Sequence, residues 1–176
     1  MIKIAVVGSP GAGKSTLTRQ LGEILCIQVF HLDAFYWKPG WVETPKEEWV
    51  EIQKNLVRKE SWIIDGNYGS TIDIRLQAAE VIIFLDLPRN LCLWRVVKRR
   101  FQYAWQRRPD MAEGCREKID WEFLRWVWKF PLDERPGLVK KLAGLSGEKK
   151  IIRLTSPAQV ERFLEEVKAE GLKTWL

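Results

Sequence analysis

The sequence predicts an α/β fold in three layers, in which a parallel sheet is covered by helices on both faces. Two observations lead to this prediction: short runs of nearly continuous apolar residues, and segments between them with apolar residues at helical spacing. Strands buried on both faces have continuous rather than alternating apolar runs. Because strands and helices alternate, right-handed crossovers between parallel strands are expected. The expected strands are residues 2–7, 29–32, 62–64, 81–87 and 150–154.

Two of the segments between strands carry start signals for a helix. Thr44, Pro45 and Glu47 fit an N-cap, a proline at the first helical position and a capping-box glutamate. Ser156 and Pro157 repeat the signal after the last expected strand. The first of these helices has its apolar stripe at Trp49, Ile52, Leu56 and Val57.

Composition indicates one globular domain over residues 1–176, with 46% hydrophobic and 30% charged residues. No apolar run approaches the roughly 18 residues that span a bilayer, so no membrane partner is expected and the cytoplasm is the expected compartment. Three cysteines without paired spacing argue against a disulfide framework, and a single histidine argues against a zinc site. The formal net charge of +6 indicates an anionic partner. The chain is expected to be a monomer or a homodimer.

The segment from Pro88 to Pro136 has helical patterns and no strand candidate. Seven lysine or arginine residues and no acid lie between Pro88 and Pro109. We expect a helix that leaves the sheet, a basic cover segment and a second helix, which together form a lid at about residues 95–135. The tryptophans of the second helix are at helical spacing and are expected to lie mostly in the core; they are Trp121, Trp126 and Trp128.

A phosphate-binding loop follows the first expected strand. Its residues are Gly8, Ser9, Pro10, Gly11, Ala12, Gly13, Lys14, Ser15 and Thr16, which fit the pattern G-x-x-x-x-G-K-[ST] between a strand and a helix. Glycines let successive N–H groups turn toward an anion, and the following helix adds its positive N-terminal end. Lys14 is expected to bridge the β- and γ-phosphates of ATP, and the Ser15 hydroxyl to ligate Mg²⁺.

Aspartates follow three of the expected strands, where a parallel sheet faces its ligand crevice. Asp65 ends an apolar strand in the Walker-B manner and is expected to hold Mg²⁺, while Gly66 lets the acceptor approach the backbone; the alternative is a turn aspartate. Asp33 is expected to take the proton of an acceptor hydroxyl, with capping of a turn as the alternative. Asp86, followed by a proline, is expected to cap a helix.

Aromatic and polar residues surround these aspartates. Phe35, Tyr36, Trp37 and Trp41 are expected to form the wall of an acceptor pocket. Asn67 and Tyr68 are expected to hydrogen-bond to the acceptor or stack on it, unless they only form a turn. His31 is expected to be packed and hydrogen-bonded.

Arginines of the expected lid are candidates for neutralising charge on the transferring phosphoryl group. Arg107 and Arg108 lie near the turn of the insertion, and Arg95 and Arg99 share a helical face. A solvated basic face and a nucleic-acid surface are the alternatives, although the sequence contains no helix-turn-helix or RNA-binding motif.

Together these motifs resemble the adenylate-kinase-like group of small P-loop kinases. More narrowly, the chain is similar to DNA topology modulation proteins in GSPGAGKST, HLDAFYWKPGW, WIIDGNYG, FLDLPRNLCLWRVVKRR and RRPDMAEGC. The resemblance implies a P-loop NTPase fold with a five-stranded sheet of order 2-3-1-4-5 and ATP as phosphate donor. It does not identify the acceptor.

This sequence differs from those of adenylate kinases in features that narrow the choice of acceptor. The position of Asp33 resembles that of an aspartate in uridine-kinase-type enzymes, where it serves a sugar hydroxyl. Adenylate kinases proper lack this residue and have an arginine just after the third-strand Asp-Gly, in a DGFPR pattern, to bind an acceptor phosphate. Here Asn67, Tyr68 and Gly69 follow Gly66, which leaves Arg75 as the candidate for that role.

The expected function is transfer of the γ-phosphate of ATP, with Mg²⁺, to a small-molecule, nucleoside or nucleotide acceptor, with a hydroxyl favoured. Two alternatives stay open. One is a nucleotide-binding regulator associated with DNA, in which ATP switches the basic segment. The other is a nucleoside monophosphate kinase that uses Arg75 and lid residues to bind the acceptor phosphate.

Overall fold

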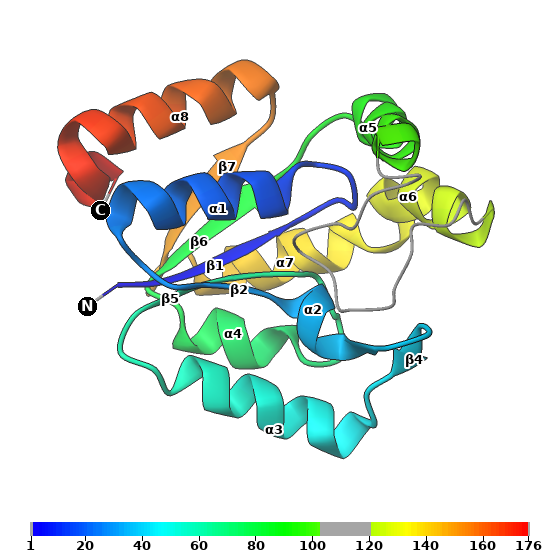
Figure 1. The fold of residues 1–176 in the computed structure, drawn as a ribbon. Coiled ribbons are helices and arrows are strands. Elements are labelled where there is room, and N and C mark those ends of the chain that lie inside the picture. Colours follow the sequence, from blue (N-terminus) through cyan, green and yellow to red (C-terminus); the bar gives the residue numbers. More distant parts are fainter. Residues whose placement is uncertain (1, 103–120, 176) are drawn as a thin grey trace.

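A central five-stranded sheet organises the chain in a computed structural model, which describes residues 2–102 and 121–175. Every pair of neighbouring strands is parallel, in the order β2-β5-β1-β6-β7 (Figure 1). Numbered among themselves along the chain, these five strands have the order 2-3-1-4-5 that the resemblance implied. The strands are β1 (Lys3–Gly8), β2 (Val29–His31), β5 (Trp62–Asp65), β6 (Val81–Leu85) and β7 (Lys150–Leu154).

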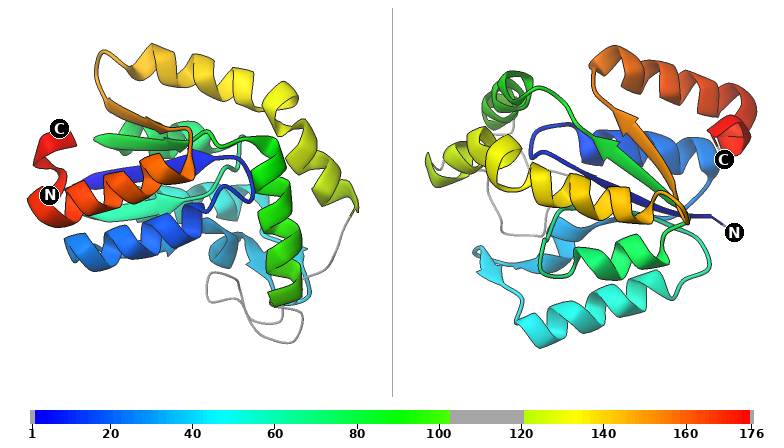
Figure 2. Two further views of the ribbon diagram at one scale, coloured as in Figure 1. Left: turned by 90° about the horizontal axis from the view of Figure 1, so that it is seen from above. Right: turned by 180° about the vertical axis from the view of Figure 1, so that it is seen from behind.

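Helices cover both faces of the sheet, as the continuous apolar strands predicted (Figure 2). On one face, Ile4 and Val6 of β1 pack in a core with residues of α1 (Lys14–Leu25) and α8 (Pro157–Glu170). On the other, Ala5 and Val7 pack with α3 (Lys46–Val57), α4 (Ile72–Ala78) and α7 (Arg135–Leu145). Alternate residues of one strand therefore stabilise two separate layers, because successive strand side chains point to opposite faces.

All but the last of the remaining elements lie beyond the carboxyl ends of the strands. Helices α5 (Arg89–Gln102) and α6 (Trp121–Asp133) pack against each other at this edge (Figure 2). After β2 come the short helix α2 (Leu32–Tyr36) and a two-stranded antiparallel ribbon of β3 (Trp37–Lys38) and β4 (Val42–Glu43). The ribbon was not predicted. A 3₁₀ helix, Gly171–Trp175, follows α8.

The two predicted helix starts have different outcomes. Ser156 is the N-cap of α8, and its hydroxyl accepts a hydrogen bond from the Gln159 backbone N–H at 3.3 Å, so that prediction is confirmed. The capping box at Thr44 is wrong. Helix α3 begins at Lys46 with Pro45 as its N-cap residue. The Thr44 hydroxyl instead lies 2.7 Å from the carbonyl oxygen of Tyr36, where it joins α3 to the end of α2.

The prediction that the tryptophans of α6 lie mostly in the core is also wrong. Trp121 is 81% exposed, and Trp126 and Trp128 are also exposed. Because α6 lies over an edge of the sheet rather than on its face, only Val127 and Phe130 of this helix are buried. No helix among the described residues is both long and apolar enough to cross a lipid bilayer.

Candidate functional site

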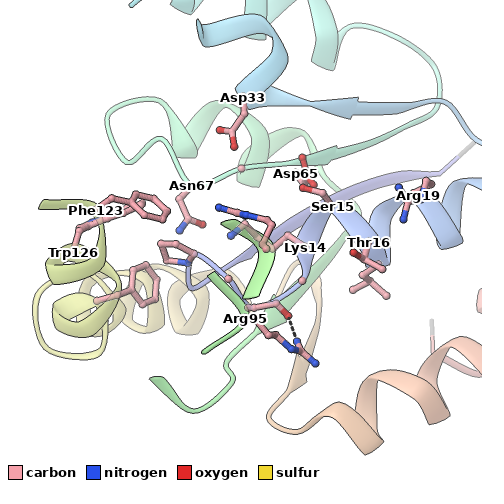
Figure 3. A pocket seen from close by; sticks show the side chains of 18 of the residues that line it. Lys14, Ser15, Thr16, Arg19, Asp33, Asp65, Asn67, Arg95, Phe123 and Trp126 are labelled. Carbon is pink, nitrogen blue, oxygen red and sulfur yellow. Dashed lines mark hydrogen bonds between the residues drawn. The ribbon is translucent and has the colours of Figure 1, made fainter. Parts of the chain in front are cut away.

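A cavity of about 1650 Å³ opens at the carboxyl ends of the strands (Figure 3). Pockets for one drug-sized ligand are usually about 300–1,000 Å³, so this cavity has room for two ligands side by side. Its wall comes from the phosphate-binding loop and α1, the segment from α2 to β4, the turn after β5, helices α5 and α6, and the start of α8.

The phosphate-binding loop has the backbone that an anion site requires. Gly8, Gly11 and Gly13 have φ angles of 144°, 78° and 95°. A Cβ on Gly8 would lie 2.3 Å from the carbonyl oxygen of Leu85, and one on Gly11 would lie 2.4 Å from that of Cys92. Only glycine fits these two positions, for conformation and for space. The loop then leads directly into the N-terminus of α1, where backbone N–H groups and the helix dipole favour an anion.

The loop residues do not all face the cavity. Those from Pro10 to Leu17 line it, including Lys14, Ser15 and Thr16, whereas Gly8 and Ser9 do not. Ser9 is buried. Gly8 is paired with the side chain of Asn67: its N–H donates to Oδ1 at 3.2 Å, and its carbonyl accepts from Nδ2 at 2.7 Å.

Lys14 extends back over its own loop. Its Nζ donates to the carbonyl oxygens of Gly8 at 2.9 Å and Ser9 at 3.0 Å. Burial lowers the pKa of the Lys14 ammonium, while the carboxylates of Asp65 and Asp33 act in the opposite direction. The Lys14 ammonium therefore contacts the carbonyls of its own loop and also lies within the electrostatic influence of both strand-end aspartates.

Asp65 is the last residue of β5 and lies beside Ser15 (Figure 3). His31 Nδ1 is 3.1 Å from both carboxylate oxygens, and the Thr18 hydroxyl is 3.1 Å from Oδ2. His31 is thus hydrogen-bonded, as predicted, but its partner and that of Thr18 could not be read from the sequence. A carboxylate and a hydroxyl are oxygen ligands of the kind that Mg²⁺ takes. Ser15 and Asp65 therefore fit that ion, which needs few protein ligands when phosphates supply the rest.

Asp33 lines the same cavity from the first turn of α2. The Tyr68 hydroxyl donates to its Oδ1 at 2.6 Å. Burial, with the Asp33 carboxylate beside it, raises the pKa of Tyr68 far above its usual range, so this hydroxyl stays protonated and remains a donor. The Tyr68 ring is packed against Tyr36 and Trp49, with centroids 4.6 Å and 4.8 Å away.

Of the four aromatic residues expected to form the pocket wall, Trp37 and Trp41 line the cavity, and Phe35 and Tyr36 do not. Tyr36 lies behind the wall. Burial and the adjacent Glu43 carboxylate raise the pKa of its hydroxyl, and Glu43 itself lines the cavity. The expected contact between Tyr36 and an acceptor therefore needs correction: Tyr36 supports Tyr68 and lies next to Glu43.

Arg75 also needs correction, because the structure places it behind the turn after β5 rather than in the cavity. It is 1% exposed. Its Nη2 donates to the carbonyl oxygens of Gly66 at 3.0 Å and Asn67 at 3.2 Å, and its Nη1 donates to Gln53. Burial lowers the pKa of its guanidinium to about 10, which leaves it cationic at neutral pH. A side chain in this position stabilises the turn and does not reach an acceptor phosphate.

The turn after β5 contacts both the phosphate-binding loop and Asp33. Asn67 pairs with Gly8 of the phosphate loop, and the next residue, Tyr68, donates to Asp33. Gly66 has a φ of 137°, and a Cβ there would lie 2.9 Å from Leu32. Glycine is therefore required at this position by its φ angle and by its close contact with the start of α2. The expected approach of an acceptor to the Gly66 backbone stays a prediction.

Helix α5 supplies cationic side chains from the lid. Arg95, Lys98 and Arg99 line the cavity, and Arg95 Nη1 donates to the carbonyl oxygen of Ala12 at 3.0 Å. Arg107 and Arg108 lie outside the described residues. Helix α6 and its C-terminal end contribute lining residues that the sequence reasoning missed: Phe123, Trp126, Phe130 and Glu134. Helical spacing alone could not identify them, because it does not say which face of α6 meets a cavity.

Asp86 does not cap α5 as expected. Its carboxylate accepts hydrogen bonds from Arg135 at 2.7 and 2.9 Å and from Arg153 at 2.9 and 2.5 Å. Burial opposes its ionisation, but the two arginines outweigh burial and hold the pKa of Asp86 below its usual value. Asp86 therefore has a structural role through ion pairs that connect the ends of β6 and β7 with the start of α7.

No family model matches the chain. The uncharacterized protein YqaC of Bacillus subtilis (strain 168) is 28% identical to it over 128 residues, which are 70% of this chain and 70% of that protein. Among solved structures, a shikimate kinase from Acinetobacter baumannii in complex with shikimate has a TM-score of 0.60 at 17% identity. That similarity covers 100% of this chain and 96% of the other.

Two other kinases have similar structures. A gluconokinase from Sinorhizobium meliloti 1021 has a TM-score of 0.56 at 15% identity, over 98% of this chain and 93% of that one. A sugar kinase from Janibacter sp. HTCC2649 has a TM-score of 0.51 at 14% identity, over 99% and 94%. At such low identity these structures establish the fold, which is that of P-loop kinases. They do not test the resemblance to DNA topology modulation proteins.

Proposed function

We propose that this protein is a Mg²⁺-dependent kinase that transfers the γ-phosphate of ATP to a hydroxyl group of a small molecule. The observation that carries the proposal is the position of Asp33. It lines the same cavity as Lys14, its charge acts on Lys14, and Tyr68 donates to it at 2.6 Å. A carboxylate in this position suits a neutral hydroxyl, whose proton must leave during transfer.

In the proposed reaction, the acceptor oxygen attacks the γ-phosphorus while the bond from that phosphorus to the β–γ bridging oxygen breaks. ADP leaves, and the hydroxyl proton passes to the Asp33 carboxylate. Backbone N–H groups of the loop and the Lys14 ammonium bind the phosphates, and Arg95 and Arg99 neutralise charge from α5. Lys14 gives up its hydrogen bonds to Gly8 and Ser9 when phosphates replace those carbonyls.

Ser15 and Asp65 are the residues that would hold Mg²⁺, which neutralises charge on the β- and γ-phosphates when bound. His31 and Thr18 orient the Asp65 carboxylate through their hydrogen bonds. Such support of a metal-binding carboxylate by neighbouring donors is common in metal sites.

The two alternative functions receive less support. A nucleoside monophosphate kinase needs a cation at the acceptor phosphate. Of its candidates, Arg75 is buried behind the turn after β5, and the lid residues Arg107 and Arg108 lie outside the described residues. A DNA-associated regulator needs its basic residues on an outer face. Arg95, Lys98 and Arg99 instead line the cavity.

The test is ADP production with a panel of nucleosides, nucleoside monophosphates and hydroxylated metabolites, followed by Asp33→Asn with the best acceptor. Transfer by this variant should fall about 100- to 10,000-fold, the usual contribution of a general base. ATP affinity should stay unchanged, because Asp33 carries no phosphate contact in the proposal. Asp73→Asn, the same chemical change at an exposed residue of α4 that does not line the cavity, is the matched control.

Two outcomes would contradict the proposal. Undiminished transfer by the Asp33→Asn variant would remove this carboxylate from the reaction. If no acceptor raises ADP production above the rate with ATP alone, and none raises the melting temperature, the kinase assignment fails.

A further inference from the structure

Charged side chains are distributed unevenly around the cavity. The cationic residues that line its described part are Lys14, Arg19, Arg95, Lys98 and Arg99, and all of them belong to α1 or α5. We call the part of the cavity lined by residues 10–20, α5 and the start of α8 the nucleotide end. The acceptor end is the part lined by residues 33–43, 66–69 and 123–134.

Acidic residues line the acceptor end. They are Asp33 of α2, Glu43 of β4 and Glu134, the residue before α7. None of the lining residues in these segments, as far as the structure describes them, is a lysine or an arginine. Carboxylates on the described lining of this end disfavour a ligand that carries its own carboxylate or phosphate group beside them, and they attract a cation.

Aromatic rings complete this end. The rings of Trp37 and Trp41 are 5.3 Å apart at an angle of 68°, which places two indole groups at the ribbon. From α6 come Phe123 and Trp126, with centroids 5.7 Å apart, and Phe130, 6.4 Å from Trp126. Phe123 and Trp126 lie on the side of the cavity near Asn67, away from Thr16 and Arg19 (Figure 3). Faces of such rings attract ammonium groups, most strongly for tryptophan.

Glu43 is fixed beside this aromatic group. It lies next to the Tyr36 hydroxyl, and Tyr36 packs on Trp37 with centroids 5.0 Å apart. Glu43 is paired with Trp37 across the two-stranded ribbon of β3 and β4. The ribbon therefore presents a carboxylate and two indole rings from a few residues, which is a combination suited to one positively charged group.

We propose that the acceptor is a hydroxylated compound that carries a positively charged amine, such as an amino alcohol or an amino sugar. Its hydroxyl lies at Asp33, and its ammonium group lies among the tryptophans and Glu43. This inference rests on the proposed function, because it assigns the substrate class of the same site. Among the described residues, no lysine or arginine lines the acceptor end, so acceptors whose second group is a carboxylate or a phosphate are expected to bind least.

The test compares matched compounds that differ in charge, with affinities measured by titration calorimetry in the presence of ADP and Mg²⁺. One set is choline and its uncharged analogue 3,3-dimethylbutan-1-ol. The other is glucosamine, glucose and gluconate. We expect the cation in each set to bind about fivefold more tightly or better than its neutral partner, and gluconate to bind least. Equal or tighter binding of the neutral or anionic compounds, or no binding of any, overturns the inference.

Two charge variants sharpen the test without removing core residues. Glu43→Gln keeps the shape and a hydrogen-bond acceptor, and should reduce the preference for the cation to about twofold or less. Glu43→Lys should make gluconate the better ligand. The control is Glu47→Gln, which changes an exposed acid of α3 outside the cavity and should leave the preference intact. A preference that survives Glu43→Gln and Glu43→Lys overturns the assignment of the ammonium group to this wall.

The test of the substrate class and the test of the proposed kinase reaction can fail independently. Cation preference is read from binding, whereas the proposed function is read from ADP production and the Asp33→Asn variant. If cations bind preferentially but no acceptor is phosphorylated, only the proposed reaction fails. If a neutral or anionic hydroxyl compound is phosphorylated well, only the proposed substrate class fails.

Discussion

The nucleotide end and the acceptor end of the cavity are built by different means. At the nucleotide end, nine consecutive residues from Gly8 to Thr16 form the loop, which leads into the N-terminus of α1, where backbone N–H groups favour an anion. At the acceptor end, residues from three separate segments line the cavity, and most of them are aromatic or acidic. Backbone groups suit a phosphate chain that is the same in every kinase, whereas side chains can be varied to select one acceptor.

The turn after β5 connects these two ends physically. Asn67 pairs with both peptide groups of Gly8, and Tyr68 holds Asp33. Arg75 supports the turn from behind through two carbonyl oxygens. The two ends can therefore be compared by substituting a residue at one end and measuring both ATP turnover and the affinity for the acceptor.

The largest effect is expected at the nucleotide end. Lys14→Met keeps the length of the side chain and removes the charge that binds phosphate. ATP turnover should fall by about 100-fold or more, because a fixed cation is lost from the transferring phosphoryl group. The same variant should keep its affinity for choline or glucosamine within about twofold. ADP production and titration calorimetry measure the two quantities on one sample.

Lys46→Met is the control, since Lys46 is exposed on α3 and does not line the cavity. A variant at Lys14 that loses acceptor binding as well would show that the two ends are not separate, and the distinction between them would fail.

A smaller effect is expected at the junction of the two ends. Tyr68→Phe removes the hydroxyl that donates to Asp33 and leaves the ring packed on Tyr36 and Trp49. A carboxylate that loses a donor is protonated more readily, so the acid limb of the pH–rate profile should move to higher pH. Transfer at neutral pH should fall by about tenfold, because the base is less well oriented. ATP affinity should not change.

The pH–rate profile separates this role from simple packing. Tyr36→Phe removes a neighbouring hydroxyl that does not contact Asp33, and it should lower activity without moving the acid limb. A Tyr68→Phe profile that coincides with that of the parent protein would show that this hydrogen bond does not control the base.

The nucleotide end could be predicted from the sequence because its information is local. Strand, glycine loop and helix follow one another within a few residues, and the glycine positions have one physical explanation. Asp33 and Asp65 were found as cavity residues by the rule that strand ends face the ligand crevice. The order of the strands was implied by the resemblance and agrees with the structure.

The acceptor end could be predicted only in part, because its residues meet through tertiary packing. Arg75 was expected to bind a phosphate, since the sequence does not show that its guanidinium turns back to Gly66 and Asn67. Trp126 was assigned to the core because helical spacing does not distinguish a helix on the face of a sheet from one at its edge. Thr44 had the pattern of a cap, but nearby carbonyls of α2 were available to its hydroxyl.

The smallest effect is expected away from both ends, at the ion pairs that attach α7 and β7 to the sheet. Asp86 has a folded-state pKa below its usual value, so its contribution to stability is present above about pH 4 and is lost as the pH falls through the folded pKa. Asp86→Asn should lower the free energy of unfolding by about 1 kcal/mol at pH 7, since Arg135 and Arg153 remain partly in water. Denaturant unfolding at pH 7 and pH 3 should show this difference shrinking at the lower pH. An effect of Asp86→Asn that is as large at pH 3 as at pH 7 would show that ionisation of Asp86 does not carry this stability.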